Sequence, residues 1–387
     1  MRICGIICEF NPFHDGHARL FKAARDSGAE LIVCAMSGHI TQRAEPAVTD
    51  KYTRAASALR CGADLVLELP YPFCAGSAEF FAKAGVGVLQ AAGADTLLFG
   101  CECGSLEKLQ KASAVRRPAK KASGNRPDSY FSELAQSAPD GDAFGSNDLL
   151  GIAYLKAIAA AGRPMEAAVC KRDGADYLDA SLPQSNTEYP SSTALRKALR
   201  EGTSVEGRMP ADAYTALMNA AKSGLCPSDE SVFGTAAMTF LRLADPASLK
   251  NFAECGGGTV QRLCKLACAC SRYEDFLQSC ATKTCTRSRA KRAVLFAMTG
   301  VTFSDLDKMP AYTQVLGTTQ AGRNYLSSLR KAENAIPLLT KPADAKLLGP
   351  AAVRQVQLGQ AADALFTLSL PAPLPKDAFL RARPVLI

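Results

Sequence analysis

The sequence predicts an α/β fold, in which a doubly wound parallel sheet is followed by a mostly α-helical domain. Three observations predict it. In the first 200 residues, short apolar runs take turns with amphipathic stretches. Within each apolar run, polar and apolar side chains do not alternate. After about residue 205, strand-like runs become rare. Apolar runs without alternation, separated by helices, are typical of parallel strands buried on both faces. We therefore expect helices on both faces of a parallel sheet.

Five apolar runs are the expected strands. Each is short, rich in Val, Ile, Leu or Cys, and bounded by Gly, Pro or a charged residue; they cover residues 2–9, 30–37, 64–69, 95–100 and 165–171. Helical patterns lie between them, at residues 17–27, 49–61, 77–91 and 147–161. Residues 112–143 interrupt the alternation with RRP, KKASG and PDGD, so we expect a surface excursion there.

The second half of the chain shows helical patterns instead. They cover residues 211–223, 231–243, 261–280 and 288–297, and a Pro-rich tail, LPAPLP, follows near the end. We therefore expect two domains, an α/β domain at residues 1–204 and a mostly helical domain at residues 205–387.

Composition excludes several classes of protein and locates the charge. The chain has 387 residues, 48% of them hydrophobic and 21% charged, so it can bury a core and is not disordered by composition. Its net charge of +8 is mild, but residues 201–387 hold 22 Lys and Arg against 15 Asp and Glu, so the excess belongs to the second half. We find no signal peptide and no apolar run of membrane-spanning length; the 15 cysteines are therefore expected to be reduced thiols of a cytoplasmic protein, with no membrane partner.

The turn after the first strand carries the strongest candidate site. It reads EFNPFHDGH, and two of the three histidines of the chain, His14 and His17, lie in it directly before a helix. Free N–H groups and the dipole at a helix N-terminus favour anions. Gly16 lets backbone and phosphate approach closely, and two imidazoles three residues apart can both reach phosphate oxygens. The alternative is that both histidines are structural.

A second polar element lies at the end of the expected α/β domain. In Ser191-Ser192-Thr193-Ala194-Leu195-Arg196, Ser191 or Ser192 can cap a helix while Arg196 reaches a leaving pyrophosphate. The alternative is a plain helix cap. Its place at the end of the same sheet favours the phosphate site.

These motifs resemble those of a known superfamily. HDGH resembles the HxGH signature of the Rossmann-like nucleotidyltransferases, which are related to class I aminoacyl-tRNA synthetases, and SSTALR resembles their SSTxxR phosphate loop. The order of EFNPFHDGH, SGHITQRAEPAV, DLVLELP, LLFGCE, SNDLLGIAYLKAI and KRDGADYLD is similar to that in the bacterial tRNA(Met) cytidine acetate ligase family. The second half continues this resemblance with TKTCTRSRAKRAVL and PAYTQVLG. One departure is Tyr177-Leu178-Asp179, where the family commonly has Tyr-His-Asp.

The resemblance implies an ATP-dependent ligase. Such an enzyme activates acetate as acetyl-adenylate and acetylates N4 of the wobble cytidine of elongator tRNA(Met), releasing AMP and diphosphate. Residues 1–204 would then be the catalytic domain and residues 205–387 the tRNA-binding domain, with Mg²⁺ as a further cofactor and no DNA partner. His14 and His17 would be catalytic. ATP would be bound by Ile7, Cys8, Glu9, Phe10, Asn11, Pro12, Phe13, His14, Asp15, Gly16, His17, Leu20, Gly100, Asn147, Arg172, Ser192 and Arg196.

Basic residues are the candidates for RNA contacts. Arg43 and Lys51 follow the second strand, and we expect both at the mouth of the site, against triphosphate or the RNA backbone. The alternative is a solvated loop. Between residues 276 and 304 there are five basic residues and no acid, a pattern that fits tRNA phosphates or, alternatively, a solvated helix face; they are Lys283, Arg287, Arg289, Lys291 and Arg292.

The cysteines of the second half do not predict a metal site. Cys264, Cys268, Cys270, Cys280 and Cys285 lack paired CxxC spacing and have no histidine beyond residue 39 to join them. Cys264 and Cys268 are expected on one buried helix face. Cys101 and Cys103, near Gly100, are expected in the wall of the site.

Two other functions fit part of the sequence. A small-molecule adenylyltransferase would use the same HxGH and SSTxxR motifs but leaves the basic second domain unexplained. A non-catalytic tRNA-binding protein would not need His14, Gly16 and His17.

Overall fold

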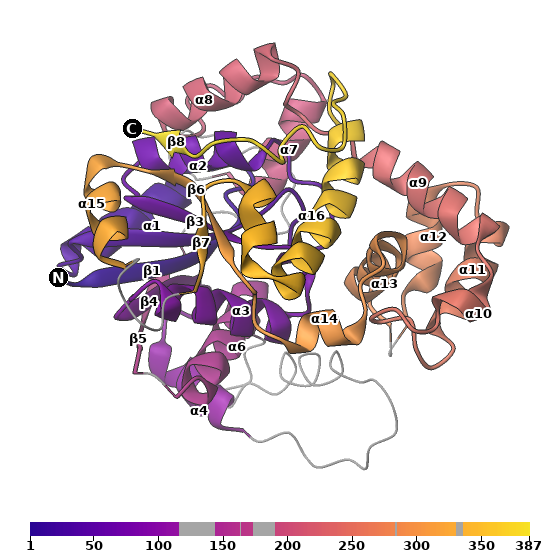
Figure 1. Cartoon of the computed structure of the whole chain (residues 1–387), viewed down its shortest axis with the longest axis horizontal. Helices are drawn as coiled ribbons and strands as arrows, with labels where there is room; N and C mark the ends of the chain where they lie inside the picture. The colour runs from indigo at the N-terminus through magenta and orange to yellow at the C-terminus, as the bar shows by residue number, and fades with distance from the viewer. Residues whose placement is uncertain (116–143, 163, 173–189, 283–284, 330–335) are drawn as a thin grey trace.

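Strands and helices alternate along the first half of the structure. A computed structural model describes residues 1–115, 144–162, 164–172, 190–282, 285–329 and 336–387. A central sheet with helices on both sides occupies one part of the molecule, and a lobe of short helices projects from it (Figure 1). The sequence-predicted excursion lies outside the described residues from residue 116 on.

The five expected strands are present within about one residue of their predicted bounds. They are β1 (Ile3–Cys8), β2 (Leu31–Ser37), β3 (Leu65–Leu69), β4 (Thr96–Cys101) and β5 (Glu166–Lys171). All pair in parallel, in the order β5-β4-β1-β2-β3. The order reverses between β1 and β4, and in doubly wound sheets ligands bind at the carboxyl ends of the strands at such a point.

Helices cover both faces of the sheet, as the apolar runs predicted. Ile7 of β1 and Val33 of β2 face one core together with α3 (Ala78–Ala91), α4 (Leu106–Ala114) and α6 (Ser146–Ala160). Cys8 of β1 and Cys34 of β2 face the other core together with α1 (Asp15–Asp26) and α2 (Lys51–Arg60). Successive strand residues point to opposite faces, so a strand buried on both sides is apolar at most positions.

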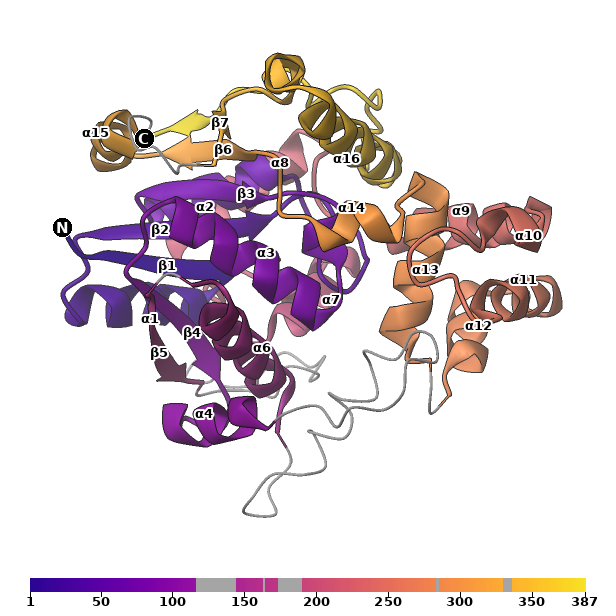
Figure 2. The ribbon, with the colours of Figure 1, turned by 60° about the horizontal axis from the view of Figure 1, so that its bottom comes forward.

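Strands in the second half, which the sequence pattern missed, extend this sheet. β6 (Thr313–Thr318) pairs antiparallel with β3, and β7 (Leu338–Leu339) and β8 (Val385–Leu386) pair with β6. Figure 2 shows β6 and β7 at the sheet edge, with α15 (Gln320–Leu329) and α16 (Pro350–Leu368) on the same side of the molecule. The expectation that strands end near residue 205 is therefore wrong. β6 reads TQVLGT, and its polar residues hid a buried antiparallel strand.

The helical lobe has its own core. Its helices α9 (Glu230–Leu243), α10 (Pro246–Leu249), α11 (Thr259–Ala269), α12 (Tyr273–Cys280) and α13 (Arg287–Thr299) enclose one apolar cluster. The single helix expected at residues 261–280 is two helices, because the chain turns extended at Cys270 and Arg272. Cys264 is buried as expected, but Cys268 is exposed at the last turn of α11, which corrects the shared buried face.

The remaining helices connect these parts. α7 (Ser192–Arg200) and α8 (Ala211–Lys222) form a small apolar cluster with Val48, and α14 (Phe303–Asp307) follows the lobe. Within the described residues, we find no helix whose length and apolar character would let it span a bilayer.

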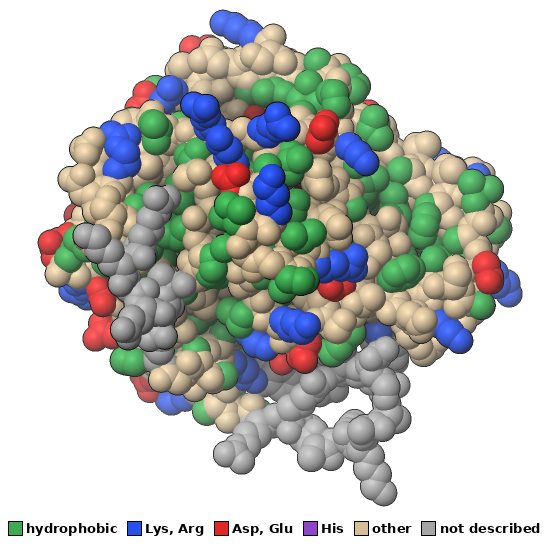
Figure 3. Space-filling view, in the orientation of Figure 1, with side chains coloured by type: hydrophobic (Ala, Val, Ile, Leu, Met, Phe, Trp, Pro, Cys, Tyr) green, Lys and Arg blue, Asp and Glu red, His purple; other side chains and the backbone are tan. Residues whose placement is uncertain are grey.

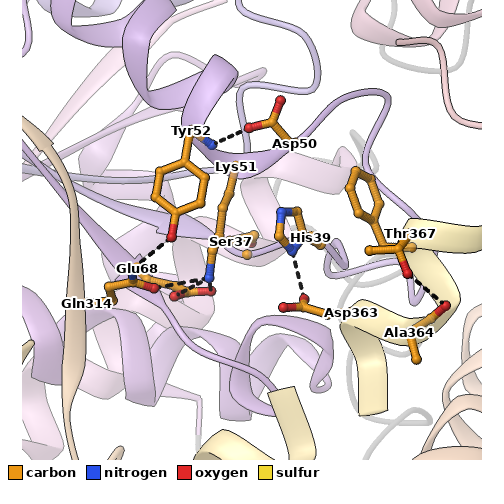
Figure 4. Close-up of polar contacts among 12 residues, drawn as sticks. Ser37, His39, Asp50, Lys51, Tyr52, Glu68, Gln314, Asp363, Ala364 and Thr367 are labelled. Carbon is orange, nitrogen blue, oxygen red and sulfur yellow. Dashed lines mark hydrogen bonds and ion pairs between the residues drawn. The ribbon is translucent and has the colours of Figure 1, made fainter. Parts of the chain in front are cut away.

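Lys51 is buried, which corrects its expected place at the mouth of the site. Its Nζ lies 2.8 Å from both carboxylate oxygens of Glu68 and donates to Gln314 Oε1 at 3.1 Å (Figure 4). Burial lowers the pKa of Lys51, but the attraction of Glu68 outweighs it and the net pKa is raised. Nearby, His39 Nδ1 lies 2.7 Å from Asp363 Oδ1 of α16. The Lys51–Gln314 bond and the His39–Asp363 pair thus connect β6 and α16 to the first half of the chain.

Candidate active site

A cavity of about 620 Å³ opens at the carboxyl ends of β1 and β4, where the strand order reverses. Its walls come from β1 and α1, from the loop after β2, from α3, from β4 and α6, from β5, and from α7 and α13. The volume is within the range of small-molecule sites. Both halves of the sequence thus contribute to one cavity.

Two sets of buried contacts hold the turn after β1: aromatic packing around Phe10 and hydrogen bonds from Arg54. Phe10 adopts φ 45°, a strained value for a residue other than glycine, and its ring packs against Phe13, His17 and Phe21 at centroid distances of 5.0, 4.9 and 5.7 Å. Arg54 of α2, buried and missed by the sequence pattern, donates to the Glu9 carbonyl at 2.6 Å and to the carbonyls of Ser37 and Gly38. The ends of β1 and β2 are thereby fixed together.

His14 and His17 cap the helix that follows, and this sets their tautomers. His14 Nδ1 accepts from the Gly16 N–H at 3.1 Å, and His17 Nδ1 accepts from the His14 N–H at 3.2 Å. The two rings stack with centroids 3.8 Å apart. An imidazole whose Nδ1 accepts carries its proton on Nε2. Both histidines therefore present an Nε2–H donor.

The histidines are neutral at physiological pH. Burial, followed by the charges of Arg172 and Arg196, lowers the pKa of His14 to about 3. Burial, followed by His14 and Arg172, also lowers the pKa of His17 well below its usual range. Together with the tautomers, this makes the pair fixed dipolar donors, which suit an oxygen atom that gains charge.

Gly16 is required by the His14 ring. A Cβ at residue 16 would lie 2.9 Å from His14 Cε1 and 3.0 Å from His14 Nδ1, closer than a real Cβ contact allows. The capping bond of His14 therefore depends on the missing side chain. This gives the HxGH spacing a physical reason beside the phosphate approach that the sequence suggested.

Two arginines lie near the histidines. Arg172 follows β5, and the Gly100 Cα is close enough that a Cβ there would lie 3.3 Å from Arg172 Cγ. Arg196 of α7 is buried and donates to the Asn11 carbonyl at 2.8 Å and to Thr193 Oγ1 at 3.2 Å. Ser191 caps α7 by accepting from the Ala194 N–H at 3.0 Å, which leaves Ser192 in the cavity wall.

Asn147 is positioned by Glu102. Its Nδ2 donates to Glu102 Oε1 at 2.6 Å, and the neighbouring Asp148 accepts from the backbone N–H groups of Glu102 and Cys103 at 2.9 and 3.1 Å. Asn147 lines the cavity at the start of α6. Glu102 thus orients the Asn147 side chain. Asn147 is not the N-cap of α6, because that position is Gly145.

The basic run of the second half lies partly in this cavity. Arg292 lines it together with Thr286 and Ser288 at the start of α13. Carboxylates lie against the run: Arg289 and Arg292 are buried 3.0 and 3.7 Å from Glu254, Lys291 pairs with Glu45, and Arg287 pairs with Glu274. On the face shown in Figure 3, Lys and Arg side chains are scattered among apolar ones, with acids beside several of them. The run is therefore neither unpaired nor a plain solvated face.

Most sequence-predicted ATP residues line the cavity. Those that do are Ile7, Cys8, Glu9, Phe10, Asn11, His14, Gly16, His17, Leu20, Gly100, Asn147, Arg172, Ser192 and Arg196. Pro12, Phe13 and Asp15 shape the turn without lining it. Among the predicted RNA residues, Arg43 and Arg292 line the cavity; Lys283 and the Tyr177–Asp179 triplet lie outside the described residues.

The cavity also contains side chains that sequence reasoning missed. Arg19, Gln42, Tyr154 and Ser288 line it beside aromatic and aliphatic residues of α3, β4 and α6. Gln42 lies one residue before Arg43, in a loop already singled out. Tyr154 and Ser288 lie within the motifs SNDLLGIAYLKAI and TKTCTRSRAKRAVL, but the pattern of those motifs did not single them out as cavity residues.

Among the described residues, one group could supply three metal ligands. It does not include the cysteines of the second half, for which the sequence predicted no metal site. Cys101, Cys103 and Asp148 have ligand atoms within 4.8 Å of one another. Burial is the main cause that raises the pKa of both thiols, that of Cys101 to about 12, and Asp148 already accepts three backbone N–H groups. This chemistry fits a structural corner beside β4 better than a metal site.

Comparison with known proteins identifies the family. A model of the HIGH nucleotidyl transferases matches residues 1–377. The tRNA(Met) cytidine acetate ligase of Syntrophotalea carbinolica is 32% identical over 360 residues, which are 88% of this chain and 85% of the relative. The ligase of Bacillus subtilis is 31% identical over 365 residues, 88% of this chain and 87% of the relative.

Solved structures agree with the sequence comparison. The crystal structure of Thermotoga maritima TmcAL in its apo form superposes with a TM-score of 0.86 at 28% identity, and the form bound with alpha-thio ATP with a TM-score of 0.84 at 27% identity. Both matches cover 100% of each chain. With the HDGH turn, the switch-point cavity and these matches in agreement, the chain belongs to the HIGH nucleotidyl transferases and, among them, to the tRNA(Met) cytidine acetate ligase family.

Proposed function

We propose that this protein is an ATP-dependent ligase that activates acetate as acetyl-adenylate and transfers the acetyl group to N4 of the wobble cytidine of elongator tRNA(Met). The observation that carries the proposal is the cavity itself. Neutral Nε2–H donors of His14 and His17 lie at a helix N-terminus beside Arg172 and Arg196, within a family whose members bear this activity in their names. AMP and diphosphate are the expected products.

In the first step, His14 and His17 bind the phosphates whose charge changes during attack. An acetate oxygen attacks the α-phosphorus of ATP, and the bond to the β-phosphate oxygen breaks. Arg172 and Arg196 stabilise the departing pyrophosphate by charge-assisted hydrogen bonds. No group has to change protonation in this step, which agrees with the neutral, fixed histidines.

Mg²⁺ is proposed as the ion that accompanies the nucleotide. Mg²⁺ prefers oxygen ligands and in such sites keeps several waters while it binds substrate phosphates. The described lining of the cavity offers one carboxylate, Glu9, and six Lys or Arg side chains. The ion would therefore be held mainly by phosphate oxygens and water, and it supplies further neutralisation of their charge.

The tRNA is proposed to approach past α13 and the loop after β2. Arg292 and Arg43 line the cavity from these two elements, so both reach an RNA whose cytidine enters it. Arg287, Arg289 and Lys291 remain predicted RNA contacts with their carboxylate partners beside them. We expect such a tRNA-modifying enzyme in the cytoplasm.

The test is an acetyl transfer assay. The protein is incubated with labelled acetate, ATP, magnesium and a tRNA(Met) transcript, and the RNA is digested to nucleosides. Label in N4-acetylcytidine that requires both ATP and RNA supports the proposal. Adenylylation of a small molecule without RNA, or no turnover, contradicts it. A transcript with uridine at the wobble position is the matched control, because it lacks the N4 amine.

A further inference from the structure

Glu9 is the carboxylate of the catalytic cavity. Among the described residues that line it, the charged side chains other than Glu9 are Lys or Arg. Glu9 is also the residue directly after β1, at the centre of the carboxyl edge of the sheet. A carboxylate repels nucleotide phosphates, so a cavity lined by six cations would bind them better without it. The position of Glu9 therefore suggests a function other than phosphate binding.

The structure fixes Glu9 at both its backbone and its side chain. Arg54 donates to its carbonyl at 2.6 Å, and the Gln42 N–H donates to Oε1 at 2.6 Å. The second carboxylate oxygen, Oε2, has no hydrogen-bond partner among the described residues. One oxygen thus holds the carboxylate in place, and the other remains able to accept a proton.

The surroundings make Glu9 more basic than an ordinary glutamate. Burial raises its pKa, and it outweighs the lowering by the Gln42 N–H and by Arg196, Arg43 and Arg54. Arg196 and Arg43 line the same cavity as Glu9, the first from α7 and the second from the loop after β2. An anionic nucleotide in the cavity raises this pKa further, because like charges disfavour ionisation.

The other polar groups of the cavity are poor proton acceptors. His14 and His17 already use Nδ1 as acceptors from backbone N–H groups, and each has its proton on Nε2. Burial raises the pKa of Tyr154 well above its usual range, so this phenol keeps its proton. The Lys and Arg side chains are donors only. Glu9 is the group left to accept a proton.

On this geometry we propose that Glu9 is the general base of the acetyl transfer step, an inference that rests on the proposed function. The N4 nitrogen of cytidine attacks the carbonyl carbon of the acetyl-adenylate and forms the N–C bond. The bond between that carbon and the phosphate oxygen breaks, and AMP leaves with the electron pair. One N4 proton passes to Oε2 of Glu9. Gln42 is the positioning residue that orients the carboxylate.

The experiment separates the two half-reactions in Glu9→Gln, Glu9→Asp and Glu79→Gln. Glu79 is exposed on α3 and serves as the matched control. Adenylate formation is measured as acetate-dependent ATP–pyrophosphate exchange, also against magnesium concentration. Transfer is measured in a single turnover from preformed enzyme–acetyl-adenylate to tRNA(Met), as a function of pH. Circular dichroism checks that each variant is folded.

We expect Glu9→Gln to lower the transfer rate by about 10²–10³-fold and to remove the fall of that rate at acid pH. Exchange falls less than about tenfold, and Glu9→Asp recovers part of the transfer rate. Equal losses in both half-reactions, a retained acid limb in Glu9→Gln, or a raised magnesium requirement as the main defect would overturn the inference. Absence of transfer by the unaltered protein would instead overturn the proposed function, and the inference with it.

Discussion

Two groups of basic residues in this chain differ in where their carboxylates lie. Around the cavity, six Lys or Arg side chains share one lining carboxylate, Glu9. On α13, four basic residues in a row of six positions are matched by Glu45, Glu254 and Glu274 from other parts of the chain. Arg292 belongs to both groups. The first group faces the space that an anion would occupy, whereas the second lies against carboxylates of the protein.

The comparison shows what a charge run in a sequence can and cannot tell. Arg292 belongs to the run by sequence and to the cavity by position, while Arg289, three residues earlier, is buried against Glu254. Helical geometry places residues three apart on neighbouring positions of one face, so Glu254 holds both. The role of each cation therefore follows from its position relative to the cavity rather than from its place in the run.

The largest expected effect is on the phosphate end of the cavity. His17→Ala removes one Nε2–H donor and the acceptor that holds the His14 N–H, so acetate-dependent ATP–pyrophosphate exchange should fall by about 10²–10³-fold. Binding of tRNA(Met), measured by filter retention, should change less than about twofold. Equal losses of exchange and of tRNA affinity would contradict a division between the two groups of residues.

A variant of Lys51 tests the role of a buried cation that is paired with a carboxylate of the protein. Lys51→Met leaves Glu68 buried without its partner, so the free energy of unfolding in urea should fall by about 3–5 kcal/mol. The double variant Lys51→Met with Glu68→Gln should recover most of that loss. An unchanged stability together with a lost exchange activity would return Lys51 to the active site.

Arg292 should sharpen the comparison within α13. Arg292→Ala should lower kcat/KM for tRNA by about tenfold, since a buried cation at the cavity wall is removed, while exchange without tRNA changes less. Arg292→Lys should keep part of the effect because it keeps the charge. Lys265→Ala, on the exposed face of α11, is the matched control. A loss as large in Lys265→Ala would point to diffuse charge instead.

The smallest effect concerns pH. Because both histidines are neutral in the folded protein, the exchange rate should show no histidine titration between about pH 6 and 8. The unfolded chain binds protons below its histidine pKa of about 6.5, so stability should fall with falling pH, by about 2 kcal/mol for His14 at pH 5. His14→Gln should remove that part of the slope in urea unfolding. A titration of His14 or His17 near pH 6.5 in the folded protein, assigned by NMR, would contradict the neutral donors.

The sequence predicted the sheet half of the fold and much of the cavity. Mostly apolar runs give β1 to β5 because a strand buried on both faces favours apolar side chains at successive positions. The HxGH turn predicted the site because a helix N-terminus after the first strand always lies at the same sheet edge.

The rest depended on contacts between distant residues. β6 has Thr and Gln at buried positions, and its hydrogen bonds to Glu68 and Lys51 make those polar side chains acceptable. In the sequence, Arg54 and Lys51 look like surface cations of a helix. In the structure both are buried, Arg54 against the Ser37 carbonyl of β2 and Lys51 against the Glu68 carboxylate of β3. Tyr154 and Ser288 line one cavity because the fold places α6 and α13, which are far apart in the sequence, on its walls.

In the proposed reaction, the cavity joins acetate to the α-phosphate of ATP before the acetyl group reaches RNA. Isotope labelling of acetate tests this order directly. The protein is given acetate labelled with ¹⁸O at both carboxyl oxygens, with ATP, magnesium and tRNA(Met), and the nucleotides are analysed by mass spectrometry. We expect AMP that carries one ¹⁸O for each acetyl group found in the RNA. Unlabelled AMP, or ¹⁸O in inorganic phosphate with ADP as the nucleotide product, would contradict it.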